Sequence, residues 1–328
     1  MNLHAAKQIG EEGVGGVAVH TENLTCTFGA ICAVDHVTLR VPSGTIFGLL
    51  GPTGAGKTTT IRLLLGLLEP TAGSAMVLGY DIHTQGDRIR QHTGALLAYS
   101  GLYDRLTALE NLDFFGRIWH MSAGDRRSRA KELLNSLGLW EQRDQLVGGW
   151  DRGQRRKLSL ARAIFHQPAL VFIDEPSDRL SPAESEAIWT DLDNLAARES
   201  MTVFLATRDL AEAEALCSAV AIMRQGRILE VGSLAELRAR TAAPQLEIVG
   251  RGFTDQVIAL VSRRPEVASA RRIDNRLVLQ LAGDYDTAPL VSLLVEASAD
   301  VEEVHKHQPA LYAAFTTLTQ EAPEEESP

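Results

Sequence analysis

The sequence is short of cysteine, of positive charge and of long apolar runs, and each shortage excludes a class of protein. Cys26, Cys32 and Cys217 form no Cys-x-x-Cys pair, so we expect reduced cytosolic thiols rather than a disulfide framework or a zinc site. The formal net charge of −10 argues against a general nucleic-acid binder, which needs a basic face. No uninterrupted apolar run approaches the ~18 residues of a membrane-spanning helix, and the first residues lack the pattern of a signal peptide. We therefore expect a cytosolic chain that does not itself cross a membrane.

One segment predicts what the chain binds. Residues 51–58 read Gly-Pro-Thr-Gly-Ala-Gly-Lys-Thr and fill the pattern Gly-x-x-x-x-Gly-Lys-[Ser/Thr] completely. The apolar run 45–50 before them predicts a buried strand, and residues 58–68 predict a helix. Glycines let backbone N–H groups turn inward and the helix N-terminus adds positive potential, so the segment predicts a phosphate-binding loop, or P-loop. The flanking strand and helix disfavour the alternative, a Gly-rich turn that matches by chance.

The residue types in and beyond this loop predict the chemistry of a nucleotide site. Lys57 would neutralise the β- and γ-phosphates, and Thr58 would hold Mg²⁺. Downstream, a second buried strand is predicted to end in Asp174 and Glu175; the first carboxylate suits Mg²⁺ coordination and the second suits polarising the attacking water. The alternative is a strand that ends in an acidic turn. The nucleotide-binding residues predicted from the loop are Gly51, Pro52, Thr53, Gly54, Ala55, Gly56, Lys57, Thr58 and Thr59.

Apolar runs and helical periods predict an α/β fold for the first 240 residues. We expect a first sheet from Val17 through the P-loop strand, then a helical period between about Arg88 and Phe165. Thr107 and Glu110 predict a capping box that opens a helix. That helix is expected to have one apolar face, formed by Leu109, Leu112, Phe115 and Trp119. Further elements are expected as a helix over 126–137, buried strands over 170–173 and 203–207, a helix over 209–216 and a hairpin turning at Gln225-Gly226.

Beyond a predicted linker at Thr241–Pro244 the order of elements changes. Strands are expected at 245–249, 267–273, 276–281 and 301–305, and helices at 255–263 and 287–297. This β-α-β-β-α-β order is that of a ferredoxin-like α+β domain. A last helix is predicted over about 309–318, before an acidic tail that we expect to be solvated.

The chain resembles the nucleotide-binding subunit of ABC transporters, specifically the branch that exports drugs and polysaccharides, from about Val17 to Leu237. The resemblance rests on the segments 47–59, 102–107, 160–163, 174–176 and 223–228, and more loosely on Pro309–Phe315, which is similar to a motif of that branch's accessory domain. It implies a P-loop NTPase fold of ABC type, with a mixed sheet and a helical subdomain. The expected ranges are a disordered segment 1–16, an ATP-binding domain 17–240 with its helical subdomain at about 88–165, an accessory domain 245–319 and a tail 320–328.

In the family that the chain resembles, two subunits enclose two ATP molecules, and each site joins the P-loop of one chain to the signature segment of the other. The resemblance therefore implies ATP and Mg²⁺ as cofactors and a second nucleotide-binding subunit, the same chain or a different one. It also implies a membrane permease that docks near Tyr99–Asn111, and a location at the inner face of the cell membrane. By the same resemblance Phe28 would stack on adenine; the alternative is a core phenylalanine on a strand.

Four positions depart from the family pattern. Ala98 stands where the family has a glutamine, and an alanine cannot ligate Mg²⁺ or hydrogen-bond a water. The signature position reads Asp151, Arg152, Gly153 and Gln154, so that a carboxylate replaces the serine that would contact the partner's γ-phosphate. The alternative is that Asp151 caps a helix beginning near Gln154, and both interpretations can hold together.

The remaining departures lie at Ser181, which replaces an aspartate, and at Arg208, which replaces a histidine that would contact the γ-phosphate. Losing one such contact lowers a rate by on the order of 10²–10³. Arg208 can itself stabilise charge on a transferring phosphate, or it can lie on the surface beside Asp209. The sequence thus predicts an intact binding half and a damaged hydrolytic half, with Glu175 and Arg208 as the candidate catalytic residues.

Three functions fit these observations. The leading hypothesis is the ATP-binding subunit of an ABC-type membrane exporter with slow hydrolysis. The first alternative is a pseudo-ATPase that acts as a regulatory or assembly module. The second is a soluble ABC-type ATPase acting on nucleic acid or ribosomes, although such chains usually carry two nucleotide domains or a long coiled-coil insert.

Overall fold

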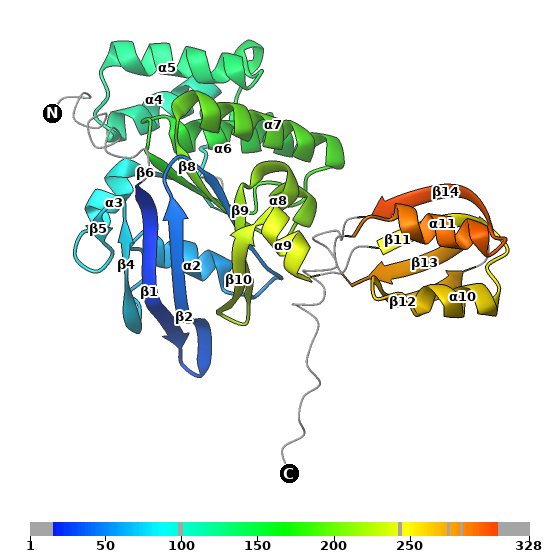
Figure 1. Cartoon of the computed structure of the whole chain (residues 1–328). Coiled ribbons are helices and arrows are strands. Elements are labelled where there is room, and N and C mark those ends of the chain that lie inside the picture. Colours follow the sequence, from blue (N-terminus) through cyan, green and yellow to red (C-terminus); the bar gives the residue numbers. More distant parts are fainter. Residues whose placement is uncertain (1–15, 98–100, 242–244, 274–275, 283–284, 308–328) are drawn as a thin grey trace. The chain divides into compact units, whose positions relative to one another are not determined.

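The computed structural model describes residues 16–97, 101–241, 245–273, 276–282 and 285–307 (Figure 1). The chain divides into two compact units, Met1–Val231 and Gly232–Pro328. Among the helices of the described ranges, none has both the length and the apolar character that a bilayer crossing requires.

The first unit contains an antiparallel sheet in the order β2-β1-β4-β5. Its strands are β1 Val17–Phe28, β2 Ile31–Pro42, β4 Ala72–Val77 and β5 Tyr80–Asp81. Val19 lies opposite Val41 on β2 and Val77 on β4, and all three side chains are fully buried. Along the second half of β2 buried and exposed residues alternate, because one face of the sheet packs on the core and the other faces solvent.

A second sheet of the first unit has the order β10-β9-β3-β8-β7-β6. Its strands are β3 Ile46–Leu50, β6 Thr93–Leu96, β7 Leu170–Asp174, β8 Thr202–Thr207, β9 Ala219–Arg224 and β10 Arg227–Ser233. The pairs β9–β3, β3–β8, β8–β7 and β7–β6 are parallel. Every residue of β7 and β8 is buried, which explains why both strands are continuous apolar runs.

Two expectations about this sheet are wrong. The strand before the P-loop, β3, does not belong to the first sheet, because it pairs with β8 and β9 on its two edges. The segment 88–165 is not wholly helical, because β6 lies within it and pairs with β7 at the edge of the sheet. Four residues are too few to show a strand period in the sequence.

The helix after the P-loop, α2, spans Lys57–Leu64 and packs against strands of both sheets. The expectation that it continues to Leu68 is wrong. Gly66 takes a positive φ of 61°, its N–H bonds to the Leu63 carbonyl, and the Leu67 N–H bonds to the Arg62 carbonyl, both at 2.9 Å. These two bonds form a Schellman motif, which satisfies the last carbonyls and ends the helix.

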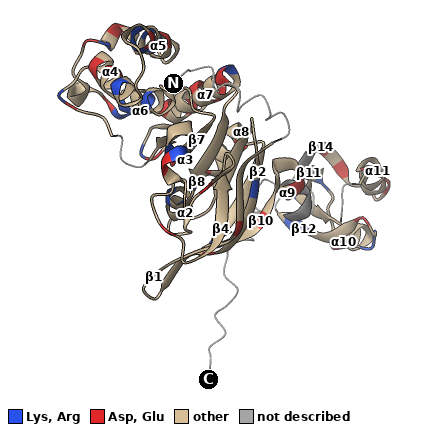
Figure 2. Cartoon of the chain, turned by 90° about the vertical axis from the view of Figure 1, so that its left-hand side faces the viewer, with Lys and Arg blue, Asp and Glu red and all other residues tan. Residues whose placement is uncertain are grey.

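Helices α4 Ala108–Ile118, α5 Ala123–Ser136 and α6 Arg152–Ile164 form the helical part of the first unit. The predicted capping box at Thr107 and Glu110 is confirmed. On the predicted apolar face of α4, Leu112 is buried and Leu109, Phe115 and Trp119 are half-buried, so none of the four side chains is exposed. The buried positions of the helix are Ala108, Asn111, Leu112 and Gly116. Figure 2 shows that acidic and basic residues are intermixed along these helices.

Further α-helices in the described part of the first unit are α3 Gly86–His92, α7 Pro182–Glu199 and α8 Leu210–Leu216. The second unit contains α9 Leu234–Thr241, β11 Gln245–Arg251, α10 Asp255–Ser262, β12 Val267–Ile273, β13 Arg276–Leu281, α11 Ala288–Glu296 and β14 Asp300–His307. Its strands pair antiparallel in the order β12-β13-β11-β14. The predicted ferredoxin-like order is therefore confirmed, whereas the predicted disordered start, last helix and tail fall almost wholly outside the described residues.

The capping box of α4 gives a test of local stability. Replacing Thr107 with Ala removes the hydroxyl that accepts the Glu110 N–H at 3.2 Å, so we expect the free energy of unfolding of the first unit to fall by about 1 kcal/mol. Thr107→Ser keeps the acceptor and should retain the stability. Denaturant titration of the three proteins measures the difference, and an unchanged midpoint for Thr107→Ala would refute the assignment.

Candidate nucleotide-binding site

The P-loop joins the end of β3 to the start of α2 in a backbone conformation that only glycine allows. Gly54 and Gly56 have φ values of 82° and 106°. A Cβ atom on Gly56 would lie 2.2 Å from the Ala33 carbonyl oxygen, and one on Gly51 would lie 2.3 Å from that of Met223. Glycine is therefore required at these positions by how closely the loop approaches two other strands.

Lys57 is folded back into this loop. Its Nζ donates to the carbonyl oxygens of Gly51 at 2.7 Å and Pro52 at 3.0 Å, and it lies 3.2 Å from Oε1 of Glu175. The residue is 5% exposed. A buried ammonium with loop carbonyls and one carboxylate around it is ready to exchange that carboxylate for phosphate oxygens.

Asp174 ends β7 directly beside the start of α2. The Thr58 hydroxyl donates to its Oδ2 at 2.7 Å. Asp174 is 2% exposed, and its Oδ1 is buried with no hydrogen-bond partner among the described residues. An unpaired buried carboxylate oxygen is unfavourable. Together with the Thr58 hydroxyl it forms the hard oxygen donor set that suits Mg²⁺.

Hydrogen bonds to both its backbone N–H and its backbone carbonyl hold Glu175 in place. Its φ of 49° is left-handed, its N–H donates to Ala206 at 2.8 Å, and its carbonyl accepts from Arg156 at 2.6 Å. The carboxylate reaches Lys57 through Oε1 and accepts the Arg208 N–H through Oε2 at 3.3 Å. These contacts fix the carboxylate at the mouth of the P-loop.

Arg156 is a site residue that the sequence did not indicate. It lies on α6, inside the basic run 155–157, which has the pattern of a solvated helix face. Burial lowers the pKa of its guanidinium, and nearby carboxylates, Asp178 first among them, oppose that shift. The contact with Glu175 joins residues 19 positions apart, and no local pattern encodes it.

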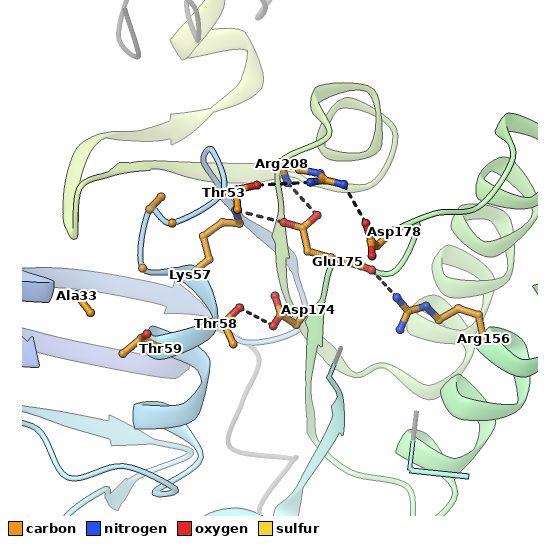
Figure 3. Close-up of a pocket in the computed structure, with 13 residues that line it drawn as sticks. Ala33, Thr53, Lys57, Thr58, Thr59, Arg156, Asp174, Glu175, Asp178 and Arg208 are labelled. Atoms are coloured by element: carbon orange, nitrogen blue, oxygen red, sulfur yellow. Dashed lines mark hydrogen bonds and ion pairs between the residues drawn. The ribbon is translucent and has the colours of Figure 1, made fainter. Parts of the chain in front are cut away.

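Arg208 follows β8 and extends across the loop. One guanidinium nitrogen lies 3.4 Å from the Thr53 hydroxyl, and the other donates to Oδ1 of Asp178 at 2.9 Å (Figure 3). The side chain is 53% exposed. Its ion pair is thus with Asp178, and not with Asp209, which instead caps α8.

These side chains line one cavity of about 340 Å³. It is lined by Ala33, Thr53, Gly54, Ala55, Gly56, Lys57, Thr58, Thr59, Arg156, Asp174, Glu175, Asp178 and Arg208. Phe28 is not among them, and its ring is 49% exposed at the end of β1. The alternative of a core phenylalanine is therefore wrong, while stacking on adenine stays a prediction.

The signature segment forms the start of α6. Asp151 accepts the Gln154 N–H at 2.8 Å, and Gln154 accepts the Asp151 N–H at 3.2 Å, so Asp151 is the N-cap. The predicted cap is confirmed, although the helix begins at Arg152 rather than near Gln154. A Cβ atom on Gly153 would lie 3.1 Å from Oε1 of Glu184. Two carboxylates therefore lie at this helix N-terminus.

The structure gives local contacts for two further positions of the family pattern, Ser181 and Arg152, and does not describe a third, Ala98. Ser181 is the N-cap of α7, in a capping box with Glu184, so a local role accounts for a serine there. Arg152 donates to the carbonyl of Arg179 at 3.3 Å. Ala98 lies outside the described residues.

A P-loop between a parallel strand and a helix, with two carboxylates at the end of a neighbouring strand, defines a P-loop ATPase. A family model described as ABC transporter matches residues 34–178. The chain is 33% identical to a daunorubicin resistance ATP-binding protein of Streptomyces coeruleorubidus, over 92% of this chain and 96% of the relative. It is also 33% identical to a doxorubicin resistance ATP-binding protein of Mycobacterium tuberculosis, over 92% and 93%.

Solved structures agree with these relatives. An ATP-binding subunit of an ABC transporter superposes with a TM-score of 0.61 at 27% identity, covering 67% of this chain and 92% of that one. A dimeric ATP-binding cassette with ADP and phosphate gives 0.60 at 25% identity, covering 66% and 98%. The chain belongs to the ATP-binding proteins of ABC transporters. It is an ATPase subunit that binds ATP.

The contact between Arg156 and Glu175 predicts a kinetic effect. Arg156→Gln removes the donor to the Glu175 carbonyl, so the carboxylate should shift and kcat for ATP hydrolysis in the assembled transporter should fall by about tenfold or more. The dissociation constant for ATP should change by less than about threefold, because the loop amides and Lys57 remain. Arg156→Lys should recover part of kcat. Equal kcat in Arg156→Gln and wild type would contradict this role.

Proposed function

We propose that the chain is the ATP-binding subunit of a membrane exporter, which couples the binding and slow hydrolysis of Mg-ATP to export through a separate permease at the inner face of the cell membrane. The observation that carries this proposal is the pairing of a complete P-loop with the Thr58–Asp174 contact and the unpartnered Oδ1 of Asp174. Dimeric structures among the solved cassettes support a second nucleotide-binding subunit.

The roles of the site residues follow from their contacts. Thr58 and Asp174 would hold Mg²⁺, which would supply positive charge to offset the negative charge of the phosphates. Lys57 would leave Glu175 for the phosphates, because nucleotide oxygens bring more charge than one carboxylate. Glu175, freed from the ammonium but still held by its backbone, would then accept a hydrogen bond from the attacking water.

Slow hydrolysis is proposed because the signature segment, at the N-terminus of α6, carries negative charge where a γ-phosphate would bind. Asp151 and Glu184 both lie at the N-terminus of α6, and Asp151 already accepts one of its amides. A phosphate brought to that helix end by a partner would meet two like charges. A partner with its own intact signature would complete this chain's site without that repulsion.

The names of the relatives support a drug-like cargo. They are ATP-binding proteins of daunorubicin and doxorubicin resistance, and both names refer to resistance to a drug-like small molecule. We therefore propose a small, drug-like molecule as the exported class. Neither a regulatory pseudo-ATPase nor an ATPase acting on nucleic acid is favoured by these relatives.

Nucleotide binding through the P-loop is tested by Lys57→Ala. Wild type should bind a fluorescent ATP analogue with micromolar to millimolar affinity, and Lys57→Ala should bind it about tenfold or more weakly, because a buried charge-assisted contact to phosphate is lost. Lys131→Ala, which removes an exposed lysine on α5, is the matched control and should bind like wild type. Equal affinity of Lys57→Ala and wild type would refute the site.

A further inference from the structure

The cavity of the P-loop is lined by three basic and three acidic side chains, namely Lys57, Arg156 and Arg208 against Asp174, Glu175 and Asp178. Four of these side chains form two direct ion pairs: Lys57 pairs with Glu175 at 3.2 Å, and Arg208 pairs with Asp178 at 2.9 Å. The charge that a polyphosphate needs is therefore neutralised by the chain's own carboxylates. Phosphate oxygens that bind Lys57 or Arg208 therefore compete with Glu175 or Asp178 for the same donors.

Asp178 is the partner of the outer cation. It lies three residues after Glu175, and its N–H donates to the Glu175 carbonyl at 3.2 Å, so its position is tied to that of the catalytic carboxylate. Its side chain is 35% exposed, which leaves the ion pair with Arg208 only partly screened by water. The half-buried guanidinium of Arg156 also attracts it.

Arg208 is placed to select between nucleotides of different length. Its guanidinium also lies 3.4 Å from the Thr53 hydroxyl, at the outer part of the loop, whereas Lys57 lies deep beneath it. The loop amides and the N-terminus of α2 hold the inner phosphates of any nucleotide. A further phosphate then projects outward, toward the end of the loop that Arg208 and Asp178 share.

We propose that Asp178 determines how strongly the site prefers ATP over ADP, because the terminal phosphate of ATP must displace Asp178 from Arg208 whereas ADP leaves that ion pair in place. The proposal rests on the proposed function of this cavity as the nucleotide site. A guanidinium fork binds carboxylate and phosphate oxygens with the same donors, so the two anions compete. Breaking the Arg208–Asp178 ion pair therefore lowers the binding free energy of ATP, whereas the binding free energy of ADP is unaffected.

The test is a comparison of two dissociation constants, measured by calorimetry with Mg²⁺ for the non-hydrolysable analogue AMP-PNP and for ADP. Asp178→Asn should bind AMP-PNP roughly two- to fivefold more tightly than wild type, the range expected for releasing a partly exposed ion pair. Its affinity for ADP should change by less than about 1.5-fold. Asp178→Glu, which keeps the charge, should bind both nucleotides like wild type.

Repeating the measurement in Arg208→Ala protein separates competition for Arg208 from simple repulsion of the nucleotide by Asp178. If Asp178 only repelled polyphosphates, Asp178→Asn would tighten the binding of AMP-PNP, and of ADP to a lesser extent, with or without Arg208. In Arg208→Ala protein, competition instead predicts that Asp178→Asn leaves the ratio of the two constants unchanged. Asp193→Asn, which removes the same charge from an exposed position on α7, controls for net charge and should have no effect on the ratio.

Each result decides the proposal. An unchanged ratio in Asp178→Asn and in Asp178→Ser, both melting like wild type, would overturn it, as would a change that persists in Arg208→Ala. Wild type that binds neither nucleotide would instead refute the proposed function, so the two failures are distinguishable.

Discussion

The parallel register of β3, β8 and β7 is the constraint on which the site depends. Leu50 lies opposite Thr207 and Asp174 lies opposite Ala206, so three strands end at one edge of the sheet. The Gly51 N–H bonds to Thr207 and the Glu175 N–H bonds to Ala206. The backbone of one strand, β8, thus positions both the P-loop and Glu175. Carboxyl ends of parallel strands meet at such an edge, and ligands bind there in open α/β sheets.

The balance of opposite charges in the cavity is the second constraint on nucleotide binding. Basic side chains gathered for a polyphosphate would repel one another in an empty site, and the acidic residues of the same cavity relieve that repulsion. We propose that nucleotide binding is therefore an exchange of partners, in which phosphate oxygens replace Glu175 on Lys57. At the N-terminus of α6 a carboxylate hinders phosphate instead, because Asp151 already accepts a backbone N–H there as the N-cap. We therefore propose that this sequence supports nucleotide binding in its own P-loop but weakens the site that α6 would complete in a partner.

Much of the fold and part of the site could be predicted because their signals are local. The P-loop, the capping box at Thr107 and the order of elements in the second unit depend on neighbouring residues and on short periods. The sheet to which β3 belongs could not be predicted, because its partners β8 and β9 lie more than 150 residues away. Arg156 and Asp178 were missed for the same reason: their roles arise only when α6 and the turn after Glu175 pack around the loop.

We propose that this chain binds ATP but cannot complete a fast hydrolytic site with a second copy of itself. Steady-state ATP turnover of the purified chain at saturating Mg-ATP, repeated after adding a different nucleotide-binding subunit that co-purifies with it, tests this proposal. Turnover of the chain alone should lie far below the ~1–10³ s⁻¹ typical of enzymes, and it should rise when that partner is present. Turnover within the typical range by the chain alone would refute the proposal.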